Sequence, residues 1–144
     1  MEIVYISTAR PDISVKEVAD ILKTARKFNL EKQITGCLLY HNKQFAQIIE
    51  GEESTINELF SAILKDKRHF DLKLLVKRET EGRVFSNWSM AFYAFSDSDF
   101  SRLDKKNFED KMSMFSDLAF KPTKALQVFW SSVKLLMEEY PINY

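Results

Sequence analysis

The chain is poor in the residues that interrupt or crosslink a polypeptide. Its 144 residues include 3 glycines, 3 prolines and a single cysteine, Cys37. So little glycine and proline argues against disorder, collagen-like repeats and glycine-rich phosphate loops. One cysteine excludes an internal disulfide framework and a cysteine-based zinc site, and 2 histidines argue against a histidine-rich metal centre. The length indicates one folded domain with room for a small appendage.

An excess of either charge is also missing. The 21 basic and 21 acidic side chains give a formal net charge of zero, so nothing indicates a nucleic acid or an anionic membrane as the partner. No apolar run approaches the roughly 20 residues that span a bilayer. The N-terminal segment MEIVYIST lacks the basic region of a signal peptide. We therefore expect a cytoplasmic protein with no membrane partner.

Hydrophobic residues are abundant, at 45% of the chain, and 12 of them are phenylalanines. Their spacing alternates between the period of strands and the period of amphipathic helices. Helices are expected to begin at a capping box formed by Ser14 and Glu17, and at Ser54 and Thr55, since Thr55 and Glu58 have the spacing of a second capping box. Strands are expected at residues 2–7, 34–40, 45–50, 71–77 and 85–95.

The resulting element order, βαββαββ, predicts an α+β fold. We expect a ferredoxin-like sheet over residues 1–95, with two helices on one face and one extra strand. Residues 96–144 are expected to form a helical extension that covers the open sheet face, makes an oligomer or partner interface, or does both. Its helices are indicated by Phe108, Met112 and Phe115, and then, after Pro122, by the stripe Leu126, Phe129, Trp130, Val133, Leu136, Met137 and Tyr140.

Three polar side chains fall on faces that the pattern predicts to be apolar. Gln47, in the strand FAQIIEG, lies between Phe45 and Ile49, while Tyr5 and Asn29 lie on other core-facing positions. Taken singly, each has an ordinary structural explanation: a backbone acceptor for the tyrosine, a loop contact for the glutamine, a helix C-cap for the asparagine. Taken together, one hydroxyl and two amides without fixed charge suit a flat heteroaromatic ligand. They do not suit acid–base hydrolysis, and no GxSxG, HExxH, P-loop or GxGxxG motif is present.

With these residues, the chain resembles the BLUF family, which consists of blue-light sensors that bind flavin, usually FAD. The resemblance lies within residues 1–95 and rests on the segments VYIS, ARKFN, ITGCLLY, FAQIIEG, KDKRHF and FSNWSM in family order. It implies FAD as the cofactor, with FMN or riboflavin as alternatives. The chain departs from many members at Phe28, where asparagine is common and we expect packing instead, and at Cys37, where leucine is common and we expect a small buried core residue.

The resemblance also implies a role for individual residues. Tyr5 would donate an electron and a proton after light absorption, Gln47 would bridge Tyr5 and the flavin ring, and Asn29 would bond the pyrimidine end of the ring. The Gln47 amide would then exchange its donor and acceptor ends, by rotation or tautomerisation, in a red-shifted signalling state. The other implied positions are Ile21 and Ile63 on the two sides of the ring, Phe45 as a shield against water, Asp66 and His69 near the ribityl and phosphate portion, and Trp88 and Met90 competing for the space beside Gln47.

An output enzyme does not fit in the roughly 50 residues that follow the sensor. The resemblance therefore implies a stand-alone sensor, not an enzyme, that signals to an unidentified protein and forms a homo-oligomer. A competing hypothesis is a light-insensitive ferredoxin-like interaction module, which would not need Tyr5 together with Gln47. A small acylphosphatase-type enzyme ranks last, because it needs a glycine-rich phosphate loop and the glycines stand only at 36, 51 and 82.

Overall fold

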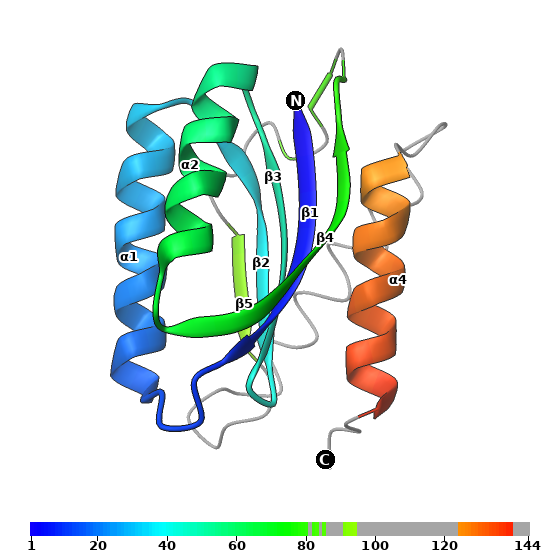
Figure 1. The fold of residues 1–144 in the computed structure, drawn as a ribbon. Helices are drawn as coiled ribbons and strands as arrows, with labels where there is room; N and C mark the ends of the chain where they lie inside the picture. The colour runs from blue at the N-terminus through cyan, green and yellow to red at the C-terminus, as the bar shows by residue number, and fades with distance from the viewer. Residues whose placement is uncertain (81, 84, 86–90, 95–123, 140–144) are drawn as a thin grey trace.

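A five-stranded sheet with helices on both faces forms the core of the computed structural model (Figure 1). The structure describes residues 1–80, 82–83, 85, 91–94 and 124–139. The predicted α+β class and ferredoxin-like arrangement are confirmed. The elements are β1 (Glu2–Ala9), α1 (Val15–Glu31), β2 (Thr35–His41), β3 (Gln44–Glu50), α2 (Glu53–Lys65), β4 (His69–Arg78), β5 (Ala91–Ala94) and α4 (Lys124–Glu139).

The strands lie in the order β4-β1-β3-β2-β5. Strand β1 is antiparallel to both β3 and β4, and β2 is antiparallel to β3 and parallel to β5. Each helical crossover therefore skips one strand: α1 connects β1 to β2 across β3, and α2 connects β3 to β4 across β1. Figure 1 shows α1 and α2 side by side on one face of the sheet, as predicted, and α4 on the other.

The two helices on the first face begin differently. Ser14 caps α1 as predicted: its Oγ accepts a hydrogen bond from the Glu17 backbone N–H at 3.1 Å, and Glu17 Oε1 accepts one from the Ser14 N–H at 3.4 Å. The second predicted capping box is wrong, because α2 begins one residue before Ser54 and its N-cap, Glu52, makes no side-chain cap bond. Tertiary packing fixes this helix start, since Ile56 is fully buried against Gly51 at the end of β3.

Two apolar cores follow from the alternation of side chains along the strands. The strand side chains that face α1 and α2 include Ile3, Tyr5, Leu38, Phe45 and Ile49. The residues next to them along each strand face the opposite way. The second core joins that opposite sheet face to α4, with Val4, Cys37, Leu39, Ala46, Ile48, Val76 and Phe85 packed against Ala125, Leu126, Phe129, Val133 and Leu136.

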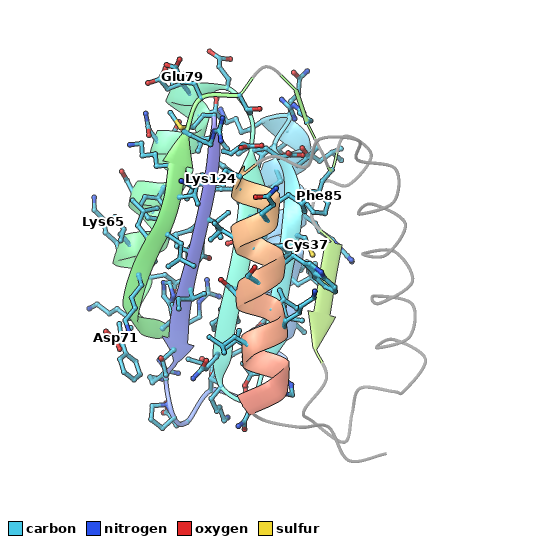
Figure 2. All side chains as sticks on the ribbon, turned by 90° about the vertical axis from the view of Figure 1, so that its right-hand side faces the viewer. Cys37, Lys65, Asp71, Glu79, Phe85 and Lys124 are labelled. Atoms are coloured by element: carbon cyan, nitrogen blue, oxygen red, sulfur yellow. The ribbon has the colours of Figure 1, made fainter. Side chains whose placement is uncertain are left out.

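Helix α4 thus covers the sheet face that α1 and α2 leave open, one of the two roles expected for the C-terminal extension. Figure 2 shows it lying along the strands, with Cys37 and Phe85 beside it. Four residues of its predicted stripe are buried, namely Leu126, Phe129, Val133 and Leu136, and Trp130 is half-buried. The side chains of Met137 and Tyr140, and the helix expected near Phe108, lie outside the described residues. The boundary between the two predicted parts stays a prediction.

The backbones of two strands approach each other closely at Gly36, so a substitution at this position tests the strand pairing. A Cβ atom at this position would lie 2.1 Å from the Ile48 carbonyl oxygen on the neighbouring strand β3. Because that atom belongs to the backbone, the strands must separate, and we expect Gly36→Ala to lower the free energy of unfolding by at least about 3 kcal/mol in urea titrations. Gly82→Ala is the matched control, since nothing lies within 4 Å of its Cβ position. Equal stability of the two variants would contradict the strand pairing.

Candidate functional site

A cavity of about 290 Å³ opens between α1, α2 and the sheet face beneath them. This volume lies near the lower end of the range for small-molecule sites, which begins at roughly 300 Å³. All eight residues predicted to contact a cofactor surround it: Tyr5, Ile21, Asn29, Phe45, Gln47, Ile63, Asp66 and His69. The structure therefore brings together side chains from β1, α1, β3, α2 and β4 that are far apart in the sequence. Their contacts with a ligand stay a prediction.

Tyr5 and Gln47 form the polar centre of the cavity. They lie directly opposite each other in the β1–β3 register, and the Tyr5 hydroxyl donates a hydrogen bond to Gln47 Oε1. Both are at least 95% buried. Gln47 is thus bonded to a side chain of the adjacent strand. This hydrogen bond explains how its amide can be buried on an apolar face.

One row of residues crosses the whole sheet at this level. Leu74, Tyr5, Gln47, Leu38 and Phe92 are successive partners on β4, β1, β3, β2 and β5. Tyr5, Gln47 and Leu38 of this row also line the cavity. Since paired residues share a sheet face, the row fixes both members of the hydroxyl–amide pair toward the helices.

Burial governs the acidity of the Tyr5 hydroxyl. Removal from water disfavours the phenolate and raises the pKa of Tyr5 above its usual value, and the negative charge of Asp66 raises it further. Asp66 keeps that charge because Arg68 binds it in a bidentate pair, with Nη2 2.6 Å from Oδ2 and Nε 2.9 Å from Oδ1. These hydrogen bonds lower the pKa of Asp66. The cavity therefore holds Tyr5 as a neutral hydroxyl beside a paired carboxylate.

Asn29 lies near the end of α1, where its side chain is 1% exposed and borders the cavity. Its backbone oxygen accepts a hydrogen bond from the Ile34 N–H at 2.8 Å, which connects the helix end to the start of β2. The alternative interpretation of Asn29 as a C-cap is wrong, because α1 continues to Glu31 and Lys32 is the cap residue.

His69 lines the cavity and contacts several neighbouring residues. Its Nε2 lies 2.7 Å from the Ile63 carbonyl oxygen, and its Nδ1 lies 2.8 Å from Ser7 Oγ. The ring also meets Tyr5 and Phe45 edge-on, with centroid distances of 6.4 Å and 6.3 Å. Ser7 was not singled out from the sequence, although it lies two residues after Tyr5 and therefore on the same strand face.

Sequence reasoning also missed part of the cavity wall. Arg68 lies between Asp66 and His69 in the segment KDKRHF, and this position in the sequence could have indicated that it lines the cavity. Phe28 does pack along the cavity, as expected, and Cys37 is a buried core residue. Trp88 and Met90 lie outside the described residues. The wall residues that the sequence did not suggest are Thr24, Ala25, Leu38, Glu58, Leu59, Ala62 and Arg68.

The cavity combines apolar walls with hydrogen-bonding groups and with the charged side chains of Glu58, Asp66 and Arg68. Over the described part of the chain, no group of three or more His, Cys, Asp or Glu side chains could hold a metal ion. Nor does any helix in that part have the length and apolarity needed to cross a membrane. A neutral hydroxyl, two amides and apolar side chains from both helices fit a planar ring with polar edges. Fold and cavity together define a ferredoxin-like domain with a cavity that fits a small planar ligand.

The sequence model of the BLUF family, "Sensors of blue-light using FAD", matches residues 1–91. The chain belongs to this family of flavin-binding blue-light sensors, so the predicted resemblance is confirmed. Its matched part is a sensor domain and not a catalytic one.

Curated relatives carry this domain within much longer proteins. The blue light- and temperature-regulated antirepressor BluF of Escherichia coli is 29% identical over 91 residues, which are 63% of this chain and 23% of that protein. The photoactivated adenylate cyclase subunit beta of Euglena gracilis is 33% identical over 87 residues, 60% of this chain and 10% of that protein. The chain thus spans a quarter or less of the length of these two relatives.

Solved structures give a more complete overlap. The dark-state structure of BlrB, a BLUF protein, is 25% identical, has a TM-score of 0.67, and covers 93% of this chain and 95% of its own. A bacterial light-regulated adenylyl cyclase is 32% identical with a TM-score of 0.63, covering 96% of this chain and 35% of its own. The ferredoxin-like arrangement is therefore shared with experimentally determined BLUF structures.

The raised pKa of Tyr5 predicts how the protein responds to alkali. A tyrosine in the unfolded chain ionises near its usual pKa of 10.0, whereas folded Tyr5 holds its proton to higher pH. Its contribution to stability is complete below about pH 10 and is lost as the pH rises beyond that value. Subtracting the ultraviolet titration of ligand-free Tyr5→Phe from that of the wild type should show no Tyr5 phenolate at about pH 10.5. A Tyr5 phenolate forming with a pKa near the usual value would contradict the buried hydroxyl.

Proposed function

We propose that this chain is a blue-light receptor in which the cavity binds a flavin and the Tyr5–Gln47 pair is the light-sensitive switch. The observation that carries the proposal is the hydrogen bond from the Tyr5 hydroxyl to Gln47 Oε1 inside the cavity. FAD is the proposed cofactor because the family description names it. FMN and riboflavin remain alternatives that share the same ring.

The residues around the cavity suit a flavin ring. Ile21 from α1 and Ile63 from α2 supply apolar surface on opposite walls, and Phe45 closes the side nearest the sheet. Asn29 and Gln47 supply amides that can both donate and accept hydrogen bonds at the polar ring edge. Asp66, held by Arg68, lies where we propose the ribityl chain leaves the cavity. Among the described residues, the charged side chains on the wall are Glu58, Asp66 and Arg68, and the guanidinium of Arg68 is paired with Asp66.

The switch follows from the chemistry of a hydroxyl and an amide. When bound, the flavin supplies absorption of blue light and an oxidising centre. Tyr5 would give an electron to that oxidising centre and release its hydroxyl proton along the bond to Gln47 Oε1, and both would return to Tyr5 once the hydrogen bonds have rearranged. Because an amide is nearly symmetric in size, Gln47 can exchange its donor and acceptor ends, by rotation or tautomerisation, without a change in volume. A different hydrogen bond at the ring edge would then persist as the signalling state.

We propose that the output is contact with a protein partner. The relatives join the same domain to an antirepressor and to adenylate cyclases, so in those proteins the domain is coupled to different outputs. In this chain Gln47 faces the cavity while its neighbours Ala46 and Ile48 pack in the core beneath α4. A backbone shift at Gln47 would therefore reach α4 directly, and α4 is the proposed route to a partner or to a second copy. Trp88 and Met90 stay proposed members of the switch.

A light-insensitive interaction module is the second candidate. It would keep the fold and would have no use for a hydroxyl and an amide buried within an otherwise apolar cavity. Burying two polar side chains is costly unless they bond to each other, and a module without a ligand gains nothing from placing that pair at a cavity wall. The Tyr5–Gln47 bond therefore favours the receptor.

The proposal predicts the absorption of the purified protein. Protein reconstituted with FAD should be yellow and should show a reversible red shift after blue light. Tyr5→Phe and Gln47→Leu should both retain flavin and lose the shift, because each removes one partner of the switching bond. Difference spectra before and after illumination measure this directly.

Tyr40→Phe is the matched control for the tyrosine variant. Tyr40 is 2% exposed, belongs to the same core as Tyr5 and does not line the cavity, so its variant should keep the full red shift. A colourless protein that takes up no added FAD would refute the receptor, and a normal shift in Tyr5→Phe or Gln47→Leu would refute the assigned roles.

A further inference from the structure

The imidazole of His69 connects three segments around the cavity. It belongs to the first residue of β4, it contacts Ser7 on β1 through Nδ1, and it contacts the carbonyl of Ile63 in the last turn of α2 through Nε2. A carbonyl oxygen can only accept, so Nε2 carries the proton and donates it to Ile63. In the neutral imidazole Nδ1 is then an acceptor, and the Ser7 hydroxyl donates to it.

The bridge crosses β1 and β4 where their backbone ladder is irregular. The register shifts between Val4 and Tyr5 and again between Ile6 and Thr8, so Tyr5 lies between two irregular points and Ser7 lies within the second. On β4, Asp71 at the same level has a φ of 54°, a left-handed conformation that is uncommon for a residue other than glycine. The β1–β4 register skips Ser7 and pairs His69 with Ala9, so the side-chain bond from Ser7 to His69 adds a link between the two strands at an irregular point of the ladder.

The same bridge reaches the residues that face the cavity. Ile63 lies on the wall formed by α2, and its carbonyl also accepts a hydrogen bond from the Asp66 N–H at 3.2 Å. The His69 ring touches the rings of Tyr5 and Phe45 edge-on. Movement of His69 would thus displace Ile63 on one side and the Tyr5 ring on the other.

We propose that the Ser7–His69–Ile63 bridge is a positioning device that sets where Tyr5 and Ile63 stand relative to each other. His69 acts through its protein contacts: both ring nitrogens are already bonded to the protein, so it has no free donor for a polar group of the cofactor. Its functional consequence rests on the proposed function: return to the dark state requires Tyr5 and Gln47 to rearrange, and the bridge restricts the movement of the Tyr5 ring through its contact with His69. Loss of the bridge loosens Tyr5 and accelerates return to the dark state.

The first experiment tests the bridge without light or flavin. Nuclear magnetic resonance of protein labelled with ¹⁵N-histidine distinguishes protonated from unprotonated ring nitrogens. The wild type should show His69 as the Nε2–H tautomer. Ser7→Val, which lacks the donor to Nδ1, should show a mixture of tautomers, and Ser7→Thr, which has the same size as valine and keeps the hydroxyl, should restore the wild-type pattern. A wild-type Nδ1–H tautomer, or identical spectra for all three proteins, would overturn the bridge.

The second experiment measures dark recovery of the red shift in flavin-loaded protein. Ser7→Val should recover about 3- to 10-fold faster than Ser7→Thr, the change expected from one net hydrogen bond. His69→Gln, which can keep the donor to Ile63, should fall between the wild type and His69→Phe. Combining Ser7→Val with His69→Phe should add little to either change, since both break the same bridge. Ser132→Ala removes the hydroxyl that bonds Val128 on α4 and should leave recovery unchanged.

The outcomes separate the bridge from the receptor. Equal recovery rates in Ser7→Val and Ser7→Thr, alongside the expected tautomer, would overturn the positioning role and leave the receptor intact. Additive rate changes in the double variant would also overturn it. A wild-type protein that binds flavin and shows no light-induced shift would refute the proposed function, and the bridge would then be a packing contact only, which overturns its role in the switch.

Discussion

The need of a buried amide for a partner organises this molecule. Gln47 occupies a strand position whose neighbours on the same face are Phe45 and Ile49, and an unbonded amide there would cost roughly 1–3 kcal/mol. The Tyr5 hydroxyl meets that need across the β1–β3 pair. For the two to be opposite, β1 must lie beside β3, and that requires crossovers that skip a strand. The strand order that places β1 beside β3 thus also places this pair in the cavity, in a domain of the family that the sequence match assigns.

Much of the fold could be predicted from periodicity and capping, because these signals are local. Signals in adjacent or regularly spaced residues indicate the helix that starts at Ser14 and the order of the strands. They also indicate that Tyr5, Asn29 and Gln47 are polar residues on core-facing positions. The start of α2 could not be predicted, since burial of Ile56 against Gly51 overrides the capping pattern around Ser54. The contact of Ser7 with His69 was also out of reach: it joins residues 62 positions apart, and neither has an unusual neighbour in the sequence.

The two faces of the sheet carry different kinds of side chain. One face carries the polar pair and the cavity, and the other carries aliphatic and aromatic residues beneath α4. Strands β1, β2 and β3 each contribute buried residues to both cores, because successive side chains alternate. Under the proposed function, a change at Gln47 on one face would reach the other face through the backbone of the same strand, with no separate connecting element. This arrangement allows a family with one sensor fold to be joined to outputs as different as an antirepressor and a cyclase.

The row Leu74–Tyr5–Gln47–Leu38–Phe92, which has one member in every strand, has a consequence for how such chains can change over time. Inserting or deleting one residue within β1 or β3 would turn Tyr5 or Gln47 toward α4, and a change of two residues would restore the face but end their opposition. Length changes in this sheet should therefore preserve the Tyr5–Gln47 opposition only in the turns. Genes for such domains should diverge freely in side chains while keeping the spacing of these strands constant.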